Sequence, residues 1–286
     1  MDHPVKWQDS YVASKHITIL TGEQLKIPGV RVFGKQHMTS AVSPLSTHYH
    51  ENAYEFVLVS EGSFTFTVGD ETYDVSGGDV FLSFPNELHS TAQSPLSLGG
   101  FFWIQLDISV MDNFLFLSEE ARGHLIEALS SMTAHVIKAE NSALVSLCKK
   151  TFKLALENEA YAAASHFVYL IYAILEASKK ISSVRTEDIQ QVINYIHDHV
   201  THDISLYDLA HLSNLSLSHF KQKFKKQIGV SPRNYINIQK IELAKKLLKE
   251  GKSKTETAML LGFNTSSYFS SVFKKYTTKT PSEYTK

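Results

Sequence analysis

The pattern of apolar and polar positions divides the chain into a strand-rich front and a helical back. Within residues 10–108, Phe64–Val68 alternates apolar and polar side chains with period two, which is typical of a strand with one buried face. The other strands predicted in this region are 54–59, 72–75 and 80–84, with turns at 60–63 and 69–70. Short strands separated by Gly and Asp predict an antiparallel barrel or jelly roll.

The period changes to that of helices after Ser118. Glu119 and Glu120 follow this serine, and acidic residues favour the first turn of a helix. Three helices are predicted from here to Lys180, with breaks near 140–141 and 158–159. Their apolar faces predict packing against the barrel, dimerisation, or both on opposite faces. Ser182-Ser183 is the only plausible linker, so the two domains are expected to be closely tethered.

The last hundred residues predict a series of capped helices. The predicted N-cap residues of three of them are Ser205, Ser216 and Ser231. Gly229 is expected to end a helix, and Pro232 suits the first position of the long helix that follows.

One pattern occurs twice in this helical region. The first copy runs from Leu206 to Lys226, and the second from Glu256 to Lys275. Each copy predicts a short helix, a tight turn and a second helix with two phenylalanines four residues apart. This is how a helix-turn-helix reads, and two such units joined by one long helix indicate a DNA-binding protein.

Charge separates the same two regions. Residues 186–286 contain 15 Lys and Arg against 9 Asp and Glu, a net charge of +6; residues 1–185 carry 13 against 20, a net charge of −7. A basic region attracts phosphates. The length suggests about two domains. The single cysteine, Cys148, excludes an internal disulfide and a cysteine-based zinc site. No signal peptide or membrane-spanning run is found, so we expect a soluble cytoplasmic protein that contacts no membrane.

Eight short segments of the last third follow one another in the order of a known family. They are Asp208-Leu209-Ala210, Phe224-Lys225-Lys226, Gly229-Val230-Ser231-Pro232, Ala244-Lys245-Lys246-Leu247-Leu248, Gly262-Phe263, Tyr268-Phe269, Phe273-Lys274-Lys275 and Pro281-Ser282-Glu283-Tyr284. In these segments the chain resembles the AraC/XylS family of bacterial transcription regulators. The resemblance implies that the second helix of each unit enters one of two successive major grooves of double-stranded DNA.

The resemblance also assigns DNA-facing residues. On the first recognition helix they are Ser218, Lys221, Gln222, Lys223, Lys225 and Lys226. The first three stand where the family reads bases, and the other three are expected at phosphates. On the second recognition helix they are Ser266, Ser267, Ser270, Ser271 and Lys274. The family often has Arg where Ser271 stands, so this helix is expected to position the protein more than it specifies the sequence.

The front half resembles the cupin-like sensor domain of many such regulators. The residues that carry this match are His48, His50, Glu55 and His89, together with Gly78-Asp79-Val80. They are expected to bind a small-molecule effector, with Phe66 and Trp103 as cavity walls. In metal-dependent cupin enzymes the same three histidines and glutamate bind one divalent metal ion. Here Asn86 replaces a usual glycine, and no cofactor is the favoured expectation, with a metal at His48, His50, Glu55 and His89 as the alternative.

These observations predict an α+β multidomain protein with three parts. Residues 1–117 form a cupin-like barrel or jelly roll, 118–181 a helical linker and dimerisation segment, and 186–286 an all-α double helix-turn-helix. The expected function is a non-enzymatic transcription regulator, in the first instance a homodimeric activator that contacts RNA polymerase. Its effector is first expected to be a carbohydrate. The alternatives are a metal-dependent cupin enzyme fused to a DNA-binding domain, and an architectural DNA binder without an effector.

Overall fold

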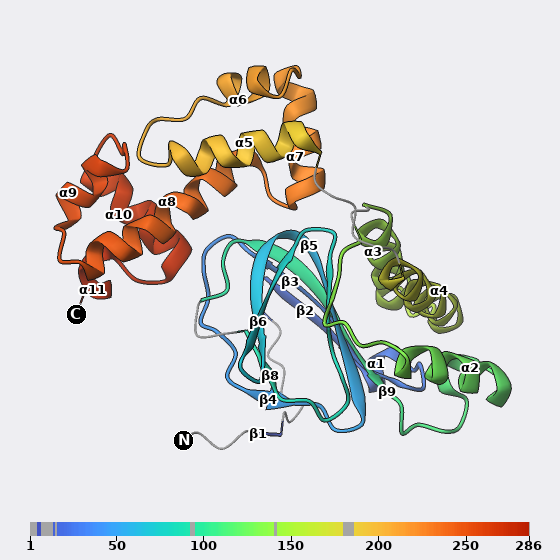
Figure 1. The fold of residues 1–286 in the computed structure, drawn as a ribbon. Coiled ribbons are helices and arrows are strands. Elements are labelled where there is room, and N and C mark those ends of the chain that lie inside the picture. Colours follow the sequence, from blue (N-terminus) through green and yellow to red (C-terminus); the bar gives the residue numbers. More distant parts are fainter. Residues whose placement is uncertain are drawn as a thin grey trace. The chain divides into compact units, whose positions relative to one another are not determined.

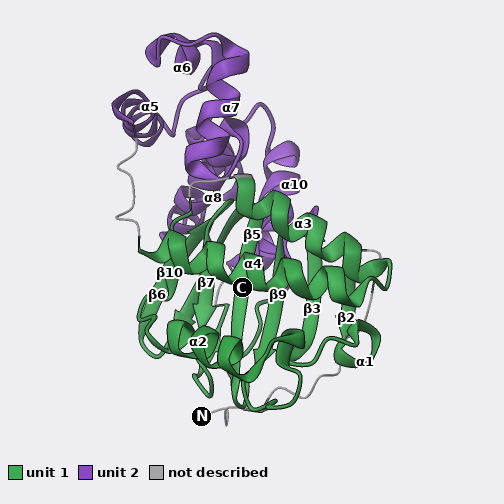
Figure 2. Cartoon of the chain, turned by 90° about the vertical axis from the view of Figure 1, so that its right-hand side faces the viewer, with its two compact units in different colours: residues 1–37, 44–93, 99–183 green, residues 38–43, 94–98, 184–286 purple. Residues whose placement is uncertain are grey.

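The chain forms two compact units. The structure is a computed structural model that describes residues 5–6, 14, 16–91, 95–139, 142–179 and 186–285. The first unit consists of residues 1–37, 44–93 and 99–183, and the second of residues 38–43, 94–98 and 184–286 (Figure 2). The predicted linker, Ser182-Ser183, and the predicted helix break at 140–141 lie outside the described residues.

A ten-stranded sheet curls through the first unit (Figure 1). Its strands are β1 (Val5–Lys6), β2 (Ile17–Thr21), β3 (Val30–Met38), β4 (His48–Tyr49), β5 (Ala53–Val68), β6 (Glu71–Ser76), β7 (Val80–Ser83), β8 (His89–Ser90), β9 (Gly99–Asp107) and β10 (Val136–Ile137). The main path runs β1-β4-β8-β5-β9-β3-β2, while β6 and β7 pair with β5 and β10 pairs with β7. Strand β5 is therefore the centre of the sheet.

Strand β5 corrects one of the sequence predictions. A turn was predicted at 60–63, but the strand continues without interruption from Ala53 to Val68. The pairing with β9 shifts register between Val59 and Glu61, and Gly62 adopts a φ of 99°. This is a β-bulge, which bends a strand without ending it. Before the bulge β5 pairs with β7, and after it with β6, so the bend lets one strand join two parts of the sheet.

Helices cover one face of this sheet. They are α1 (Gly22–Leu25), α2 (Glu119–Ser130), α3 (Ser142–Leu156) and α4 (Ala160–Ser178), with a short 3₁₀ helix at Phe114–Phe116. Ser118 caps α2 by accepting from the amide of Ala121, which confirms the predicted start. The rings of Phe152 on α3 and Phe167 on α4 meet Phe33 of the sheet at 4.8 and 4.9 Å between centroids. The two helices lie side by side and share the sheet's apolar core (Figure 1).

Helix α4 is long and apolar enough, by length and composition alone, to cross a membrane. Its side chains at Phe167, Leu170, Ile171 and Ile174 are buried in the core that it shares with the sheet. This is the arrangement of a core helix in a folded domain.

The second unit is helical. Its helices are α5 (Glu187–Asp198), α6 (Leu206–Leu212), α7 (Leu217–Ile228), α8 (Pro232–Lys249), α9 (Lys254–Leu260), α10 (Ser266–Thr277) and α11 (Pro281–Tyr284). The three predicted caps are confirmed, since Ser205, Ser216 and Ser231 each accept a hydrogen bond from a first-turn amide. Gly229 ends α7 with a φ of 79°, a conformation that glycine adopts without a steric cost.

Two separate apolar cores hold this unit together. The first lies between α5, α6 and α7 and contains Phe220 and Phe224. The second lies between α9 and α10 and contains Phe269 and Phe273. Helix α8 contributes to both: Ile236 packs in the first core, whereas Ile238 and the apolar positions after it, including the buried Ile241, pack in the second. The predicted pair of helix-turn-helix units is thus two small structures on one connecting helix.

Candidate functional site

A cavity of about 230 Å³ lies inside the barrel of the first unit. The residues that line it are Ile17, Ile19, Gln36, Leu45, His48, His50, Glu55, Val57, Phe66, His89, Ser90, Thr91, Phe101, Trp103 and Gln105. All six side chains expected to bind an effector are among them. The lining is mostly apolar, and its ionisable groups lie together at one end.

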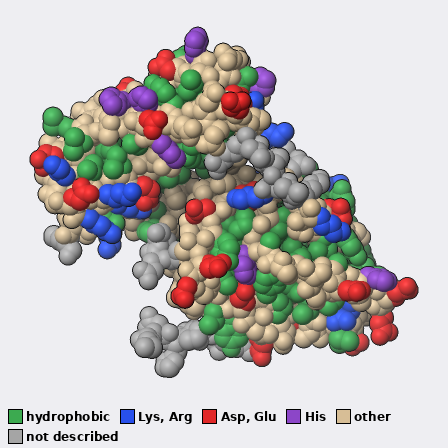
Figure 3. Space-filling view, viewed as in Figure 1, with side chains coloured by type: hydrophobic (Ala, Val, Ile, Leu, Met, Phe, Trp, Pro, Cys, Tyr) green, Lys and Arg blue, Asp and Glu red, His purple; other side chains and the backbone are tan. Residues whose placement is uncertain are grey.

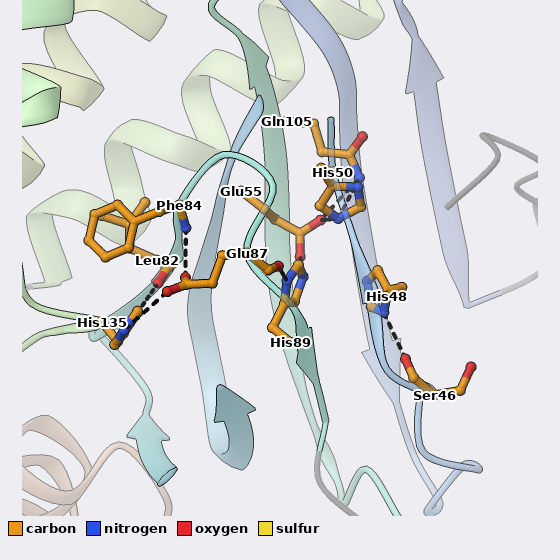
Figure 4. A network of polar contacts seen from close by, with 10 residues as sticks. All are labelled: Ser46, His48, His50, Glu55, Leu82, Phe84, Glu87, His89, Gln105 and His135. Atoms are coloured by element: carbon orange, nitrogen blue, oxygen red, sulfur yellow. Dashed lines mark hydrogen bonds and ion pairs between the residues drawn. The ribbon is translucent and has the colours of Figure 1, made fainter. Parts of the chain in front are cut away.

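Strand pairing assembles that polar end. His48 on β4 pairs directly with His89 on β8, and Glu55 on β5 pairs with Gln105 on β9. The Nε2 atom of His50 is 3.0 Å from Glu55 Oε2, and Gln105 Nε2 donates to the same oxygen at 3.1 Å (Figure 4). His89 Nε2 lies 3.6 Å from the other oxygen of Glu55, too far for a hydrogen bond. All five side chains are buried, so a ligand that binds here would be desolvated.

The histidine tautomers follow from their outer partners. His48 Nδ1 faces the carbonyl oxygen of Ser46 at 2.7 Å, and His89 Nδ1 faces that of Glu87 at 2.9 Å. A carbonyl can only accept, so Nδ1 must be the donor in both rings and Nε2 faces the cavity. In His48 burial, aided by the nearby His89, lowers the pKa to about 4, so this ring is neutral at pH 7 and its Nε2 offers a lone pair.

Glu55 is the charged centre of the cluster. Burial acts to raise its pKa, but the adjacent His50 and His89 outweigh burial and hold the pKa well below the usual value. Burial likewise acts to lower the pKa of His89, and the Glu55 carboxylate reverses the shift so that this pKa is raised. The cluster therefore presents an ionised carboxylate beside the neutral ring of His48 and the ring of His89, whose pKa is raised.

The cluster also has the composition of a metal site. The ligand atoms of His48, His50, Glu55 and His89 all lie within 4.8 Å of one another. The Nε2 atom of His89 is buried without a hydrogen-bond partner. Outer hydrogen bonds from Nδ1 to carbonyls are the usual support of metal-binding histidines. The four side chains thus fit a divalent ion as well as an organic ligand.

Aromatic side chains form part of the cavity wall. Phe66 stacks on Phe81 with 4.2 Å between centroids, which fixes its ring. The indole of Trp103 lies against Gly34, where a Cβ atom would stand only 2.1 Å from the ring. Gly34 is therefore what leaves room for Trp103 beside the cavity.

Gln105 is the main site residue that the sequence prediction missed. It follows Trp103 by two positions in a strand, so it had to face the same side of the sheet. That rule was available from the sequence, but the partner Glu55 becomes visible only once β5 and β9 are paired.

The predicted DNA-facing residues lie on α7 and α10 of the second unit. On α7, Phe220 and Phe224 are fully buried, and the exposed residues are Ser218, Lys221, Gln222, Lys225 and Lys226. Lys223 differs from them, because it is half-buried and its Nζ is 2.7 Å from the Asp188 carboxylate of α5. A DNA phosphate would have to compete with that partner.

On α10 the hydroxyl groups are already engaged. Ser267, Ser271 and Lys274 are exposed, and Ser266 and Ser270 are half-buried. The Oγ atom of Ser270 donates to the carbonyl of Ser266 at 2.8 Å, and that of Ser271 donates to the carbonyl of Ser267 at 3.1 Å. With their protons used inside the helix, Ser270 and Ser271 present acceptor lone pairs outward.

Basic side chains are mixed with others over the surface. On the face shown in Figure 3, Lys and Arg side chains lie among acidic and histidine side chains instead of forming an unbroken basic patch. The basic surplus of residues 186–286 therefore does not gather on that face.

Comparisons with known proteins address both units. The family described as "AraC-like ligand binding domain" matches residues 35–164, and the family described as "Helix-turn-helix domain" matches residues 209–286. The lactose operon transcription activator of Staphylococcus xylosus is 25% identical over 236 residues, which cover 79% of this chain and 81% of that protein. The transcriptional regulator YbfI of Bacillus subtilis is 23% identical, with 77% and 80% covered.

The chain belongs to the AraC family.

Solved structures are also similar to it. The C-terminal domain of the response regulator yesN from Fusobacterium nucleatum is 30% identical, covers 34% of this chain and 96% of that chain, and has a TM-score of 0.33. ToxT from Vibrio cholerae is 15% identical, with 95% and 98% covered and a TM-score of 0.35. This AraC family chain is a helix-turn-helix transcription regulator with a ligand-binding domain, controlled by a small-molecule effector.

The exposure pattern of α7 in this AraC family regulator yields a test of base reading. Lys221→Ala and Gln222→Ala are expected to relax sequence preference at one position each, by roughly 1–3 kcal/mol of discrimination. Lys226→Ala is expected to weaken all sequences alike, because a phosphate contact carries no base information. Binding-site selection with the three variants measures this, and unchanged site preferences for the first two would refute the assignment.

Proposed function

We propose that this regulator activates transcription as a cytoplasmic homodimer when a small polar molecule, in the first instance a carbohydrate, occupies the barrel cavity. The observation that carries the proposal is the buried polar cluster around Glu55 in a mostly apolar cavity. Side chains of this kind are costly to bury unless they bind something or satisfy one another. Here His89 Nε2 is left without a hydrogen bond.

The chemistry of the lining supports an uncharged, hydroxyl-bearing effector. The residues found to line the cavity in the described part of the chain include no Lys or Arg, so an anion would meet the Glu55 carboxylate without a strong counter-charge. Hydroxyl groups can donate to Glu55 and to the His48 Nε2 lone pair. Trp103 and Phe101 offer flat apolar walls. The similar Staphylococcus xylosus protein is named as an activator of a lactose operon, which supports both the carbohydrate and the activator role.

The outer face of α4 supports the homodimer. Tyr161, Tyr169 and Tyr172 are exposed there, and Tyr161 meets the ring of Phe116 at 4.5 Å between centroids. Aromatic side chains are enriched at protein interfaces. An activator of this kind would in turn contact RNA polymerase.

A double substitution tests the cavity. His50→Ala with Glu55→Ala is expected to keep the fold and basal DNA binding but to abolish the response to the effector, because both partners of the 3.0 Å contact are lost. A thermal-shift screen of monosaccharides and disaccharides on the unmodified protein identifies the effector. DNA binding with and without that sugar is then compared between the two proteins.

The matched control changes the same residue types outside the cavity. His124→Ala with Glu127→Ala alters exposed side chains on α2 and should respond as the unmodified protein does. If the cavity variant still responds fully, the effector binds elsewhere and the cluster is structural.

A second candidate is a cavity that holds one divalent metal ion. The four ligand atoms within 4.8 Å and the unbonded His89 Nε2 favour it. His48, His50, Glu55 and His89 would hold the ion, which would polarise an oxygen atom of a bound ligand. Elemental analysis of the purified protein tests for the metal. Turnover of a cavity ligand in the metal-loaded protein would favour the alternative of a cupin enzyme fused to a DNA-binding domain.

A further inference from the structure

Lys240 occupies an unusual place in the second unit. It lies on α8 between Ile236, which belongs to the first apolar core, and Ile241, which belongs to the second. Its side chain is 6% exposed, and it is the only buried lysine or arginine in the part of the chain that the structure describes. An ammonium group is seldom buried unless it is paired, so its contacts need an explanation.

One set of contacts joins Lys240 to the second helix-turn-helix. Its Nζ atom donates to the carbonyl oxygen of Leu261 at 2.7 Å, where α9 ends and the turn toward α10 begins. The same atom lies 5.5 Å from the centre of the Phe263 ring. A cation at a helix C-terminus and over an aromatic face is stabilised by both. Lys240 thus anchors the turn of the second helix-turn-helix to the connecting helix α8.

The charge of Lys240 also interacts, over a longer distance, with the loop that precedes the first helix-turn-helix. Burial lowers the pKa of Lys240, and the Asp203 carboxylate opposes this shift. Asp203 lies in the loop between α5 and α6. Gly262, next to Leu261, has a φ of 67°, and a Cβ atom there would stand 3.4 Å from the Thr201 carbonyl oxygen. The turn of the second helix-turn-helix therefore lies against the loop that leads into the first helix-turn-helix.

Because the two cores are separate, apolar packing alone does not fix the relative orientation of the two helix-turn-helix motifs. Apolar contacts are non-directional, whereas a buried charge with a fixed acceptor favours one geometry. We propose that Lys240 is a positioning residue that sets the spacing and orientation of the recognition helices α7 and α10. It thereby determines which separation of two DNA half-sites the protein accepts.

The dimensions are consistent with this role. Helix α8 has 18 residues and therefore a length of about 27 Å. Successive major grooves on one face of DNA are about 34 Å apart. Inserting one base pair between half-sites moves the second by about 3.4 Å and rotates it by roughly 34°. A rigid junction between the two helix-turn-helix motifs cannot adjust to the altered spacing, whereas a flexible junction can.

The experiment uses the full-length chain and the site obtained by binding-site selection. Affinity is measured for that site and for versions with one base pair inserted or removed between the half-sites. The unmodified protein is expected to lose roughly tenfold in affinity for each altered spacing, similar to the cost of a mismatched contact. Lys240→Met keeps the length of the side chain and loses the ammonium. It is expected to reduce the ratio of the affinity for the selected site to the affinity for an altered spacing to about twofold to threefold.

Two further variants make the result decisive. Lys246→Met removes an exposed charge from the same helix and should lower affinity for all spacings equally, leaving the ratio unchanged. Asp203→Asn changes an exposed residue, so it should fold even if Lys240→Met does not, and it should lower the ratio in the same direction. An unchanged ratio in Lys240→Met, or in Asp203→Asn where the former does not fold, overturns the proposal. So does an unmodified protein that is indifferent to spacing.

Discussion

Raising the salt concentration from 50 to 200 mM is expected to weaken DNA binding by the full-length protein about a thousandfold. The second unit exposes six lysines on or beside its recognition helices: Lys221, Lys225, Lys226, Lys274, Lys275 and Lys279. Each lysine that neutralises a phosphate releases a counterion, and six such contacts give a loss of about this size over that range. Fluorescence anisotropy with a labelled site at a series of salt concentrations measures the slope.

Single substitutions make this prediction specific. Replacing Lys226 by Ala should lower the slope of log affinity against log salt by about one, because one phosphate contact is lost. Lys150→Ala, on α3 of the other unit, should leave the slope unchanged. A slope below about two for the unmodified protein would show that phosphate contacts do not dominate its affinity.

Replacing Phe224 by Ala is expected to cost about 3–5 kcal/mol in the stability of the first helix-turn-helix. The ring is fully buried between α5, α6 and α7 and packs edge-on against Phe220 at 5.7 Å. Because the second core lies between other helices, the loss should be local. Hydrogen exchange followed by mass spectrometry should show faster exchange in α6 and α7, with little change in α10.

The control for this prediction is a smaller truncation of the same side chain. Phe224→Leu keeps much of the apolar volume and should show the same pattern with a smaller loss. Equal loss of protection in α7 and α10 would mean that the second unit unfolds as a single cooperative structure, contrary to its two separate cores.

The helical unit was the part of the fold that the sequence predicted best. Its start signals are local, since a serine cap and the amide that it bonds lie two or three residues apart. The paired phenylalanines on α7 and α10 lie four residues apart, so one turn of helix places them together. Fold class and family could therefore be predicted, and both are confirmed.

Features that depend on distant residues were harder to predict. Gly62 has the residue type of a turn, and only the pairing of β5 with β9 shows that it lies in a bulge. Lys223 looks like a phosphate contact, but its carboxylate partner comes 35 residues earlier in the chain. The polar cluster was an intermediate case, because His48 and His50 share a face by alternation while His89 joins them through the β4–β8 pairing.

The two separate cores have a consequence for how such a protein changes over generations. Substitutions among the outward serines of α10 do not disturb the packing that supports α7, so one recognition helix can acquire a new preference while the other keeps its old one. A lineage can then move to a new promoter in two small steps instead of one large one. At the intermediate stage, half of the ancestral operator is still read.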